Sequence, residues 1–304
     1  MSTHPVTPQQ VPSFLPESPL VPNARLRQIY TLMLQCRALH QRIGSLVAEG
    51  RVAAELLPPA GEEATLASTA AELRPGDALL CSRRDWLPAM LKGVPLAKIT
   101  RWLLAGPGSR PRALSDGAYH LEALPSRPDS QLASALETAI THKRKKNSLA
   151  LAYIGSEVSA AAWQQALEPA ARRRLPVLFV CRTSTQQPQP ADLLALAHAS
   201  QTPHIYVDGG DALAVYRVAQ EATGRARRKL GPTLIECRLE SSPPSTGAGT
   251  SSLESDPFAA MERHLAAKGI FSPAWKQEVE AAFTQQLESA LLSATGRTAS
   301  VANR

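Results

Sequence analysis

The residue types that usually carry chemistry occur in this 304-residue chain, but not at the spacings of common active sites. The sequence contains no G-x-S-x-G nucleophile turn, no Walker phosphate loop, no H-E-x-x-H zinc motif and no Rossmann glycine fingerprint. Its seven histidines are scattered, and a lone His120 or His198 is more typical of a surface or satisfied core residue than of a ligand. Asp208-Gly209-Gly210-Asp211 resembles a metal loop, but a tight turn followed by a helix-capping aspartate explains it better. Any site must therefore be assembled by the fold.

The formal net charge of +7 is concentrated in three basic clusters, at 143–146, 172–174 and 225–229. Each cluster falls at the C-terminal end of a predicted helix, where cations offset the negative end of the helix dipole. No aromatic residues interleave with them, as a stacking platform for nucleic acid would require. We therefore interpret the clusters first as helix-end stabilisation and second as a surface for an acidic partner protein, with nucleic acid a distant third.

The sequence predicts a cytoplasmic protein that neither spans nor contacts a membrane. No apolar run approaches the ~20 residues needed to cross a bilayer. The N-terminus has no charged segment followed by an apolar core, so we expect no secretory signal. The four cysteines are widely separated without a C-x-x-C pair, and three lie in apolar stretches, as small buried hydrophobes do.

Composition divides the chain into four segments. Residues 1–22 are rich in proline, which predicts a disordered tail. Residues 23–240 form the main α/β domain, whose first helix has an apolar stripe that must pack against the core or a second subunit. Residues 241–255 have the Ser/Pro/Gly composition of a flexible linker. Residues 256–304 are predicted to be a helical extension that opens with a capping Asp256.

The core lies between 131 and 240, where apolar runs alternate with helical periods. We expect helices at 132–143, 160–173, 191–199 and 211–229, and strands at 78–81, 149–154, 177–181, 205–207 and 233–237. The strands are apolar on both faces, which is typical of fully buried parallel strands. The fold class predicted is therefore α/β, a doubly wound parallel sheet with its functional crevice at the carboxyl ends of the strands. Residues 105–130, rich in Pro, Gly, Ser and Arg, are predicted to form an irregular loop.

An ordered series of motifs runs through this core. The series comprises Gly61-Glu62-Glu63-Ala64, Arg74-Pro75-Gly76-Asp77, Arg84-Asp85, Gly155-Ser156-Glu157, Leu175-Pro176-Val177-Leu178-Phe179-Val180-Cys181, the stretch 206–216 and Gly231-Pro232-Thr233-Leu234-Ile235-Glu236. Taken in order over roughly residues 24 to 292, it resembles the α subunit of the decarboxylating first component of 2-oxo acid dehydrogenase complexes (pyruvate, branched-chain and acetoin types). Those proteins carry G-Q-E-A, Y-R-D-H, G-D-G, L-P-V-x-F-V, N-N and G-P-T-L-I-E in the same order.

The resemblance implies a thiamine-diphosphate-binding fold and a shared cofactor site. In that family thiamine diphosphate lies between an α and a β subunit. Mg²⁺ ties the diphosphate to the α subunit through the Asp of G-D-G and the first Asn of N-N, since a hard cation prefers oxygen ligands. On this chain the implied cofactor-binding residues are Gly155, Ser156, Glu157 and Thr183, with Arg84 on the diphosphate. The implied partners are a β subunit or a second copy of this chain, and a lipoyl domain.

Several family positions are altered here. Ser156 stands in place of the metal-binding Asp and Thr183 in place of the Asn, and a hydroxyl is a poorer ligand than a carboxylate. Glu157 could move in as a ligand, so the metal ligands are left unassigned. Trp86 replaces the histidine of Y-R-D-H, and the segment 241–255 contains no histidine, so no catalytic residue is assigned.

Two functions follow from these observations. The first is oxidative decarboxylation of a 2-oxo acid with acyl transfer to lipoyl, together with a β subunit. The second is a degenerate paralogue that kept the fold and interface and acts as a structural or regulatory subunit. Fold alone does not decide between them, because activity belongs to the site.

Overall fold

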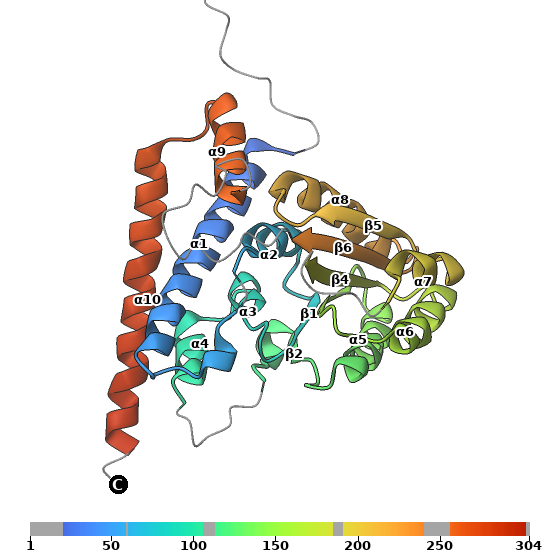
Figure 1. The fold of residues 1–304 in the computed structure, drawn as a ribbon, viewed down its shortest axis with the longest axis horizontal. Coiled ribbons are helices and arrows are strands. Elements are labelled where there is room, and N and C mark those ends of the chain that lie inside the picture. Colours follow the sequence, from blue (N-terminus) through green and yellow to red (C-terminus); the bar gives the residue numbers. More distant parts are fainter. Residues whose placement is uncertain (1–20, 59, 106–112, 185–190, 240–255, 302–304) are drawn as a thin grey trace, which may run out of the picture.

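A parallel β-sheet forms the centre of the computed structural model, which describes residues 21–58, 60–105, 113–184, 191–239 and 256–301 (Figure 1). In those residues the sheet has six strands in the order β2-β1-β3-β4-β6-β5. Their bounds are β1 Ala78–Cys81, β2 Leu121–Ala123, β3 Ala150–Ile154, β4 Val177–Ser184, β5 His204–Asp208 and β6 Thr233–Leu239. Every pairing is parallel, which confirms the predicted fold class.

Alternate residues of the central strands enter two separate hydrophobic clusters, one on each face of the sheet. Leu151 of β3 and Val180 of β4 belong to the first cluster, whereas Ala152 and Phe179 belong to the second. Nearly every residue of β1, β3 and β4 is buried. A strand covered on both faces needs apolar side chains at every position, which is why the sequence reads as continuous apolar runs.

Ten α-helices surround the sheet in the described part of the chain. They are α1 Asn23–Ala48, α2 Glu63–Ala70, α3 Pro88–Leu91, α4 Leu96–Leu103, α5 Pro128–Lys143, α6 Ala160–Arg172, α7 Leu193–Ala199, α8 Ala212–Arg227, α9 Pro257–Ala267 and α10 Pro273–Val301. Helices α5, α6 and α7 cover one face, whereas α8 packs on the other face against β4, β5 and β6. Helices α1 and α10 run beside each other at the far side of α2 (Figure 1).

The apolar stripe of α1 is buried within this chain rather than left for a second subunit. Leu26, Ile29, Leu39 and Ile43 are all fully buried, in contacts that involve α2, α9 and α10. The C-terminal extension joins the same core, because α10 contributes apolar side chains to it and Glu288 pairs with Arg42 at 2.5 Å. The stripe therefore does not itself indicate a dimer interface.

The predicted elements match the structure to within a few residues, with three differences. The segment read as an irregular loop contains the edge strand β2 and the start of α5, because Leu121 adds to β1 through main-chain hydrogen bonds that composition does not reveal. The sequence also predicts a helix that starts near Asp85, after the strand at 78–81, and the structure begins it at Pro88. For the last helix the sequence predicts an end at about Leu292, whereas α10 continues about nine residues further, to Val301.

The capping aspartates behave as predicted. Asp256 accepts a hydrogen bond from the backbone N–H of Phe258, and Asp211 accepts from Leu213 and Ala214. The predicted tail at 1–22 and linker at 241–255 lie almost entirely outside the described residues. The described helices include none that is long and apolar enough to cross a bilayer.

Candidate functional site

The carboxyl ends of the strands point toward α1 and α2, and the residues implied by the motifs lie at this edge (Figure 1). Ile154 pairs with Cys181 in the β3–β4 register. Ser156 and Thr183 each lie two residues past that pair, so the fold brings the two altered metal positions to neighbouring strand ends. Thr183 is buried, and among the described residues its hydroxyl has no hydrogen-bond partner.

Glu157 lies in the turn after β3. Its carboxylate folds back over Gly155, so close that a Cβ atom at position 155 would overlap it. The carboxylate atoms are the far end of a flexible side chain that could turn away, and Gly155 has no positive φ angle, so the close approach does not by itself require glycine. The Glu157 residue as a whole is exposed.

A buried ion triad centred on Arg182 occupies the same edge. The guanidinium of Arg182 donates from Nη1 to Oε2 of Glu62 and from Nη2 to Oδ1 of Asp85 at 2.7 Å. The exposed fractions of the three side chains are 7%, 8% and 11%, so the charges are withdrawn from bulk water together. Glu62 is the N-cap of α2, Asp85 follows β1 and Arg182 lies near the end of β4. Three segments distant in sequence thus meet through opposite charges.

Hydrogen bonds extend this triad into the core. The Arg182 guanidinium lies 5.8 Å from the centroid of the Tyr153 ring, and the Tyr153 hydroxyl is 2.7 Å from Oγ1 of Thr69. Thr65, one turn earlier on α2, donates to the carbonyl of Gly209 at 2.9 Å. Helix α2 is therefore fixed to strand β3 and to the turn after β5, which holds the edge rigid.

Burial changes the ionisation of the triad. Burial raises the pKa of Glu62 to about 7, although the neighbouring Arg182 opposes that rise. Burial disfavours the charge on Arg182, but Asp85 and Glu62 outweigh it and raise the pKa of the guanidinium. Arg182 is thus a permanent cation beside Thr183, and Glu62 is the member of the triad that titrates near neutrality.

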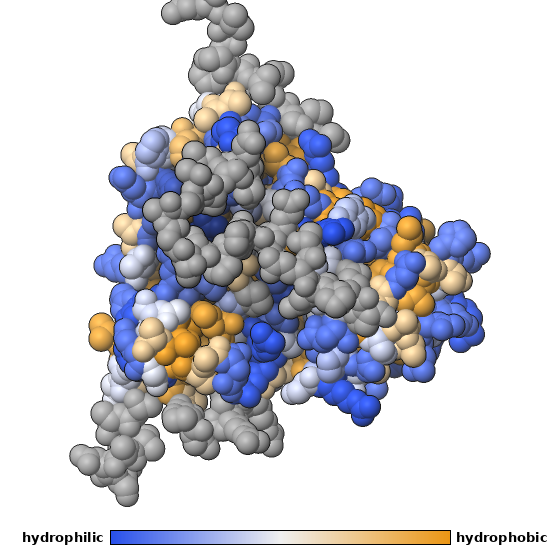
Figure 2. Space-filling model, viewed as in Figure 1, coloured by the Kyte–Doolittle hydropathy of each residue, from blue (hydrophilic) through white to orange (hydrophobic). Residues whose placement is uncertain are grey.

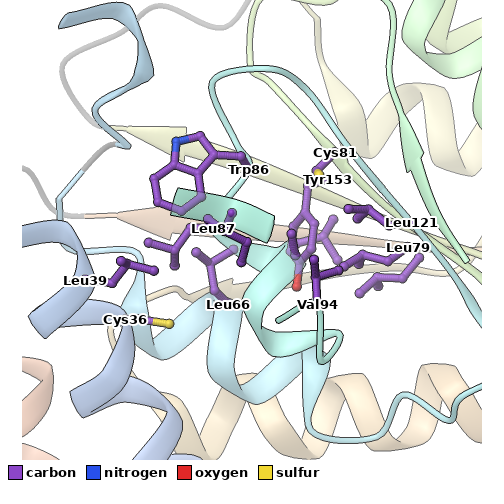
Figure 3. Packing of buried hydrophobic residues seen from close by; sticks show 14 of the residues in the cluster. Cys36, Leu39, Leu66, Leu79, Cys81, Trp86, Leu87, Val94, Leu121 and Tyr153 are labelled. Atoms are coloured by element: carbon purple, nitrogen blue, oxygen red, sulfur yellow. The ribbon is translucent and has the colours of Figure 1, made fainter. Parts of the chain in front are cut away.

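Trp86, at the position of the family's histidine, is a core residue (Figure 3). Its ring is fully buried beside Leu87, and its indole N–H donates to the carbonyl of Leu56 at 2.7 Å. An indole with its one donor satisfied in this way fixes the loop after β1 and offers no proton to a ligand. Arg84, the predicted diphosphate contact, is exposed in that loop, immediately before Asp85.

The side chains at this edge do not fit a magnesium site of the kind implied by the motifs. The two family positions offer the hydroxyls of Ser156 and Thr183, and Glu157 is the carboxylate nearest to them along the chain. Arg182, which precedes Thr183, supplies only N–H donors, and these are already paired with Glu62 and Asp85, so it adds no oxygen ligand. Among the described residues, no group of three or more His, Cys, Asp or Glu side chains is placed to hold a metal ion.

Sequence reasoning missed the triad, although it had singled out two of its members as parts of motifs. The signal was the single basic residue, Arg182, directly after the apolar run Val177–Cys181 of the predicted strand. A charge at such a position is buried with its strand and must be paired. Glu62 and Asp85 both belong to the ordered series of motifs, so they were candidates for its partners.

The fold and site define an α/β protein with a doubly wound parallel sheet and a polar, buried carboxyl edge. A family model described as the dehydrogenase E1 component matches residues 30–300, and the chain therefore belongs to that family. The pyruvate dehydrogenase E1 component subunit alpha of Staphylococcus aureus strain Mu50 is 29% identical over 284 residues, which covers 86% of this chain and 76% of the relative. The protein of the same name from Staphylococcus epidermidis strain RP62A is 27% identical over 299 residues, covering 90% and 80%.

Membership in the family confirms the resemblance drawn from the motifs. Because the match runs from α1 into α10, it includes the C-terminal helices as well as the sheet. The family is one of thiamine-diphosphate-dependent 2-oxo acid dehydrogenase α subunits and α-subunit-like proteins.

Proposed function

We propose that this chain is the α-type subunit of a 2-oxo acid dehydrogenase first component and assembles with a β subunit. The reaction of that assembly is oxidative decarboxylation of a 2-oxo acid with transfer of the acyl group to a lipoyl domain. The observation that carries the proposal is the family match across residues 30–300. The names of the relatives, each an E1 component subunit alpha, support it. The four buried free cysteines fit a reducing compartment, and we propose the cytoplasm.

Co-expression with a β subunit tests this proposal. We expect the two chains to co-purify and to elute together at a mass above that of either chain. The complex is then assayed with pyruvate and with branched-chain 2-oxo acids, in the presence of thiamine diphosphate, Mg²⁺ and an artificial electron acceptor. Turnover of one of these acids supports the catalytic role. Failure to co-purify with any β subunit tested contradicts the assignment.

A second candidate, a degenerate paralogue with a structural or regulatory role, rests on one observation at the site and is not favoured by the family match. The edge that should hold the metal carries Ser156, Thr183 and the guanidinium of Arg182, and these do not form an oxygen cage for Mg²⁺. A complex with the β subunit that forms but shows no turnover supports this candidate. Thiamine diphosphate binding that is tight and depends on Mg²⁺ contradicts it, because another oxygen ligand such as Glu157 must then have taken over.

A further inference from the structure

The three basic clusters noted in the sequence meet on one surface at the amino ends of the strands. Helices α5, α6 and α8 run opposite to the strands and end at this edge, each with one cluster at its C-terminus. Direct contacts join the clusters. Lys143 donates to the carbonyl of Arg173, and Arg227 donates to the carbonyl of Asn147 at 2.7 Å. A Cβ atom on Gly231 would lie 3.8 Å from the Cα of Arg174, so the clusters at 172–174 and 225–229 also adjoin each other.

This surface, hereafter the basic face, consists of residues 143–146, 172–174 and 225–229. It holds eleven of the chain's 33 Lys and Arg residues and no acidic residue. The remaining 22 basic residues are outnumbered by 26 acidic ones elsewhere, so the basic face accounts for the whole positive balance of the chain. Eight of the eleven are exposed: Arg144, Lys145, Lys146, Arg172, Arg173, Arg174, Arg228 and Lys229.

Helix-end stabilisation explains only part of this arrangement. A cation in the last turn of a helix interacts favourably with the dipole, but that effect falls off within one turn and is already met by one or two side chains. Like charges on adjoining helix ends repel one another over about one Debye length, ~8 Å at physiological salt. Among the described residues, the eight exposed cations form one ion pair, the long Arg172–Glu168 contact at 3.9 Å, so the repulsion is hardly relieved.

The backbone gives a second indication that the cations are retained for a purpose. Arg174 and Lys229 have φ angles of 47° and 57°, in the left-handed region that glycine occupies most easily. Both residues end a helix with the same hydrogen-bond pattern. The N–H of Leu175 donates to the carbonyl of Ala170, and the N–H of Leu230 donates to the carbonyl of Arg225. Glycine is the common residue at such positions, and this chain places a cation there instead, at a cost in backbone energy.

An exposed apolar side chain lies among these cations. Leu230 directly follows Lys229 and is 47% exposed, one of four large hydrophobic side chains of the described residues with a substantial exposed area. In Figure 2, hydrophobic surface also lies among hydrophilic surface at the end of the molecule formed by α6 and α7. The phosphate backbone of a nucleic acid is contacted by polar and charged groups, and an exposed leucine adds nothing to such a contact. Protein interfaces, in contrast, combine apolar contacts with a charged rim, so Leu230 favours a protein partner.

We propose that the basic face is a docking surface for an acidic protein partner, with Leu230 as its apolar contact. It lies at the edge of the sheet opposite to the candidate functional site, so a partner held there leaves the carboxyl edge free. Charge complementarity of this kind steers encounter and raises the association rate more than it raises affinity. Binding should therefore weaken steeply as the salt concentration rises.

The test compares two triple variants with the same change of net charge. The first, Arg144→Glu, Arg173→Glu and Arg228→Glu, reverses the basic face. The second, Arg101→Glu, Arg217→Glu and Arg263→Glu, reverses three exposed cations on α4, α8 and α9 away from it. The probes are three fluorescent molecules matched in charge: an oligoglutamate, a peptide that mixes glutamate with leucine, and a DNA duplex. Fluorescence anisotropy is measured on the full chain, with its β subunit where assembly requires one.

We expect the first variant to lose at least about tenfold in affinity for the glutamate–leucine peptide, and the second to stay within about twofold. Leu230→Ser should weaken binding of the glutamate–leucine peptide but not of the oligoglutamate. Equal losses in the two triple variants would reduce the effect to net charge and overturn the proposal. Tighter binding of DNA than of either peptide, lost only in the first variant, would overturn it in favour of a nucleic-acid surface.

Discussion

The two ends of the same β-sheet carry charge in opposite ways. At the carboxyl end, Arg182 is buried and held between Glu62 and Asp85, so both signs are present and matched. At the amino end, eight of the eleven cations of the basic face are exposed to water, whereas Arg227 is largely buried and pairs with Asp77 at 2.7 Å. The same parallel topology produces both ends, because each crossover helix begins near the carboxyl edge and ends near the amino edge. Burial therefore decides whether a cation must be paired: Arg182 and Arg227 are buried and paired, whereas the exposed cations need no partner.

The difference has a direct energetic consequence. A charge removed from water is tolerated only with a partner, so losing one partner leaves an uncompensated buried charge. An exposed cation keeps its hydration and contributes little to the free energy of unfolding, whether or not it is paired. Substitutions at the two ends should therefore differ in size, and at some positions in sign.

The largest effect is expected from Arg182→Met, which leaves Glu62 and Asp85 buried without their shared cation. We expect a loss of about 3–5 kcal/mol in the free energy of unfolding, or failure to fold, measured by urea denaturation at neutral pH. The matched variant Arg173→Met at the amino end should change it by no more than about 0.5 kcal/mol. If the two variants lose the same free energy of unfolding, the charges of the triad do not depend on Arg182 for their stability in the buried edge.

The second prediction concerns the pH dependence of stability that Glu62 should impose. Its pKa is about 7 in the folded chain and near 4.5 when exposed, so the folded state holds the proton more tightly. Stability should therefore fall as pH rises from about 4.5 to about 7, by up to roughly 3 kcal/mol, and lose nothing more to this group above that window. Glu62→Gln should flatten the profile in that window. The exposed Glu168→Gln is the control and should leave the profile unchanged.

The fold followed from the sequence because its signals are local and repeated. Apolar runs such as that at 149–154 alternate with helical periods, and each run becomes a buried parallel strand. The edge strand β2 was missed because three residues leave too short a pattern, and it forms by pairing with β1 far away in the chain. The burial of the α1 stripe depends on α10, which is too distant in sequence to be paired with it by pattern alone.

The candidate site could be predicted only as a set of positions. The motifs brought Ser156 and Thr183 to one edge, and the strand register places them there. The charged residues at this edge could not be predicted, because the triad joins Glu62, Asp85 and Arg182 across sequence separations of up to 120 residues. Spacing in the sequence carries no information about a contact of that kind. Likewise, the three basic clusters were visible as separate helix ends, but not as one surface.

A smaller effect is expected from restoring oxygen ligands at the carboxyl end. Ser156→Asp together with Thr183→Asn places a carboxylate and an amide at the two family positions. We expect Mg²⁺-dependent binding of thiamine diphosphate to tighten by at least about tenfold, or roughly 1.4 kcal/mol, by calorimetry. Chelation of the metal should remove the gain, and activity should not return. An unmodified chain that already binds the cofactor tightly with Mg²⁺ would contradict our reading of the edge.

The smallest effect, opposite in sign, is expected from Arg174→Gly at the amino end. Its φ of 47° lies where glycine avoids the steric cost, so the substitution should raise the free energy of unfolding by about 0.5–1 kcal/mol. Arg173→Gly is the control, because its φ of −87° suits any residue and glycine there only adds freedom to the unfolded chain, which lowers stability. Both variants should weaken binding of the glutamate–leucine peptide to a similar extent, since each removes one cation from the basic face. A chain that gains stability while losing affinity at position 174 would show that the cation there is held for binding and against the preference of the backbone. Unchanged affinity in Arg174→Gly would remove this position from the proposed docking surface.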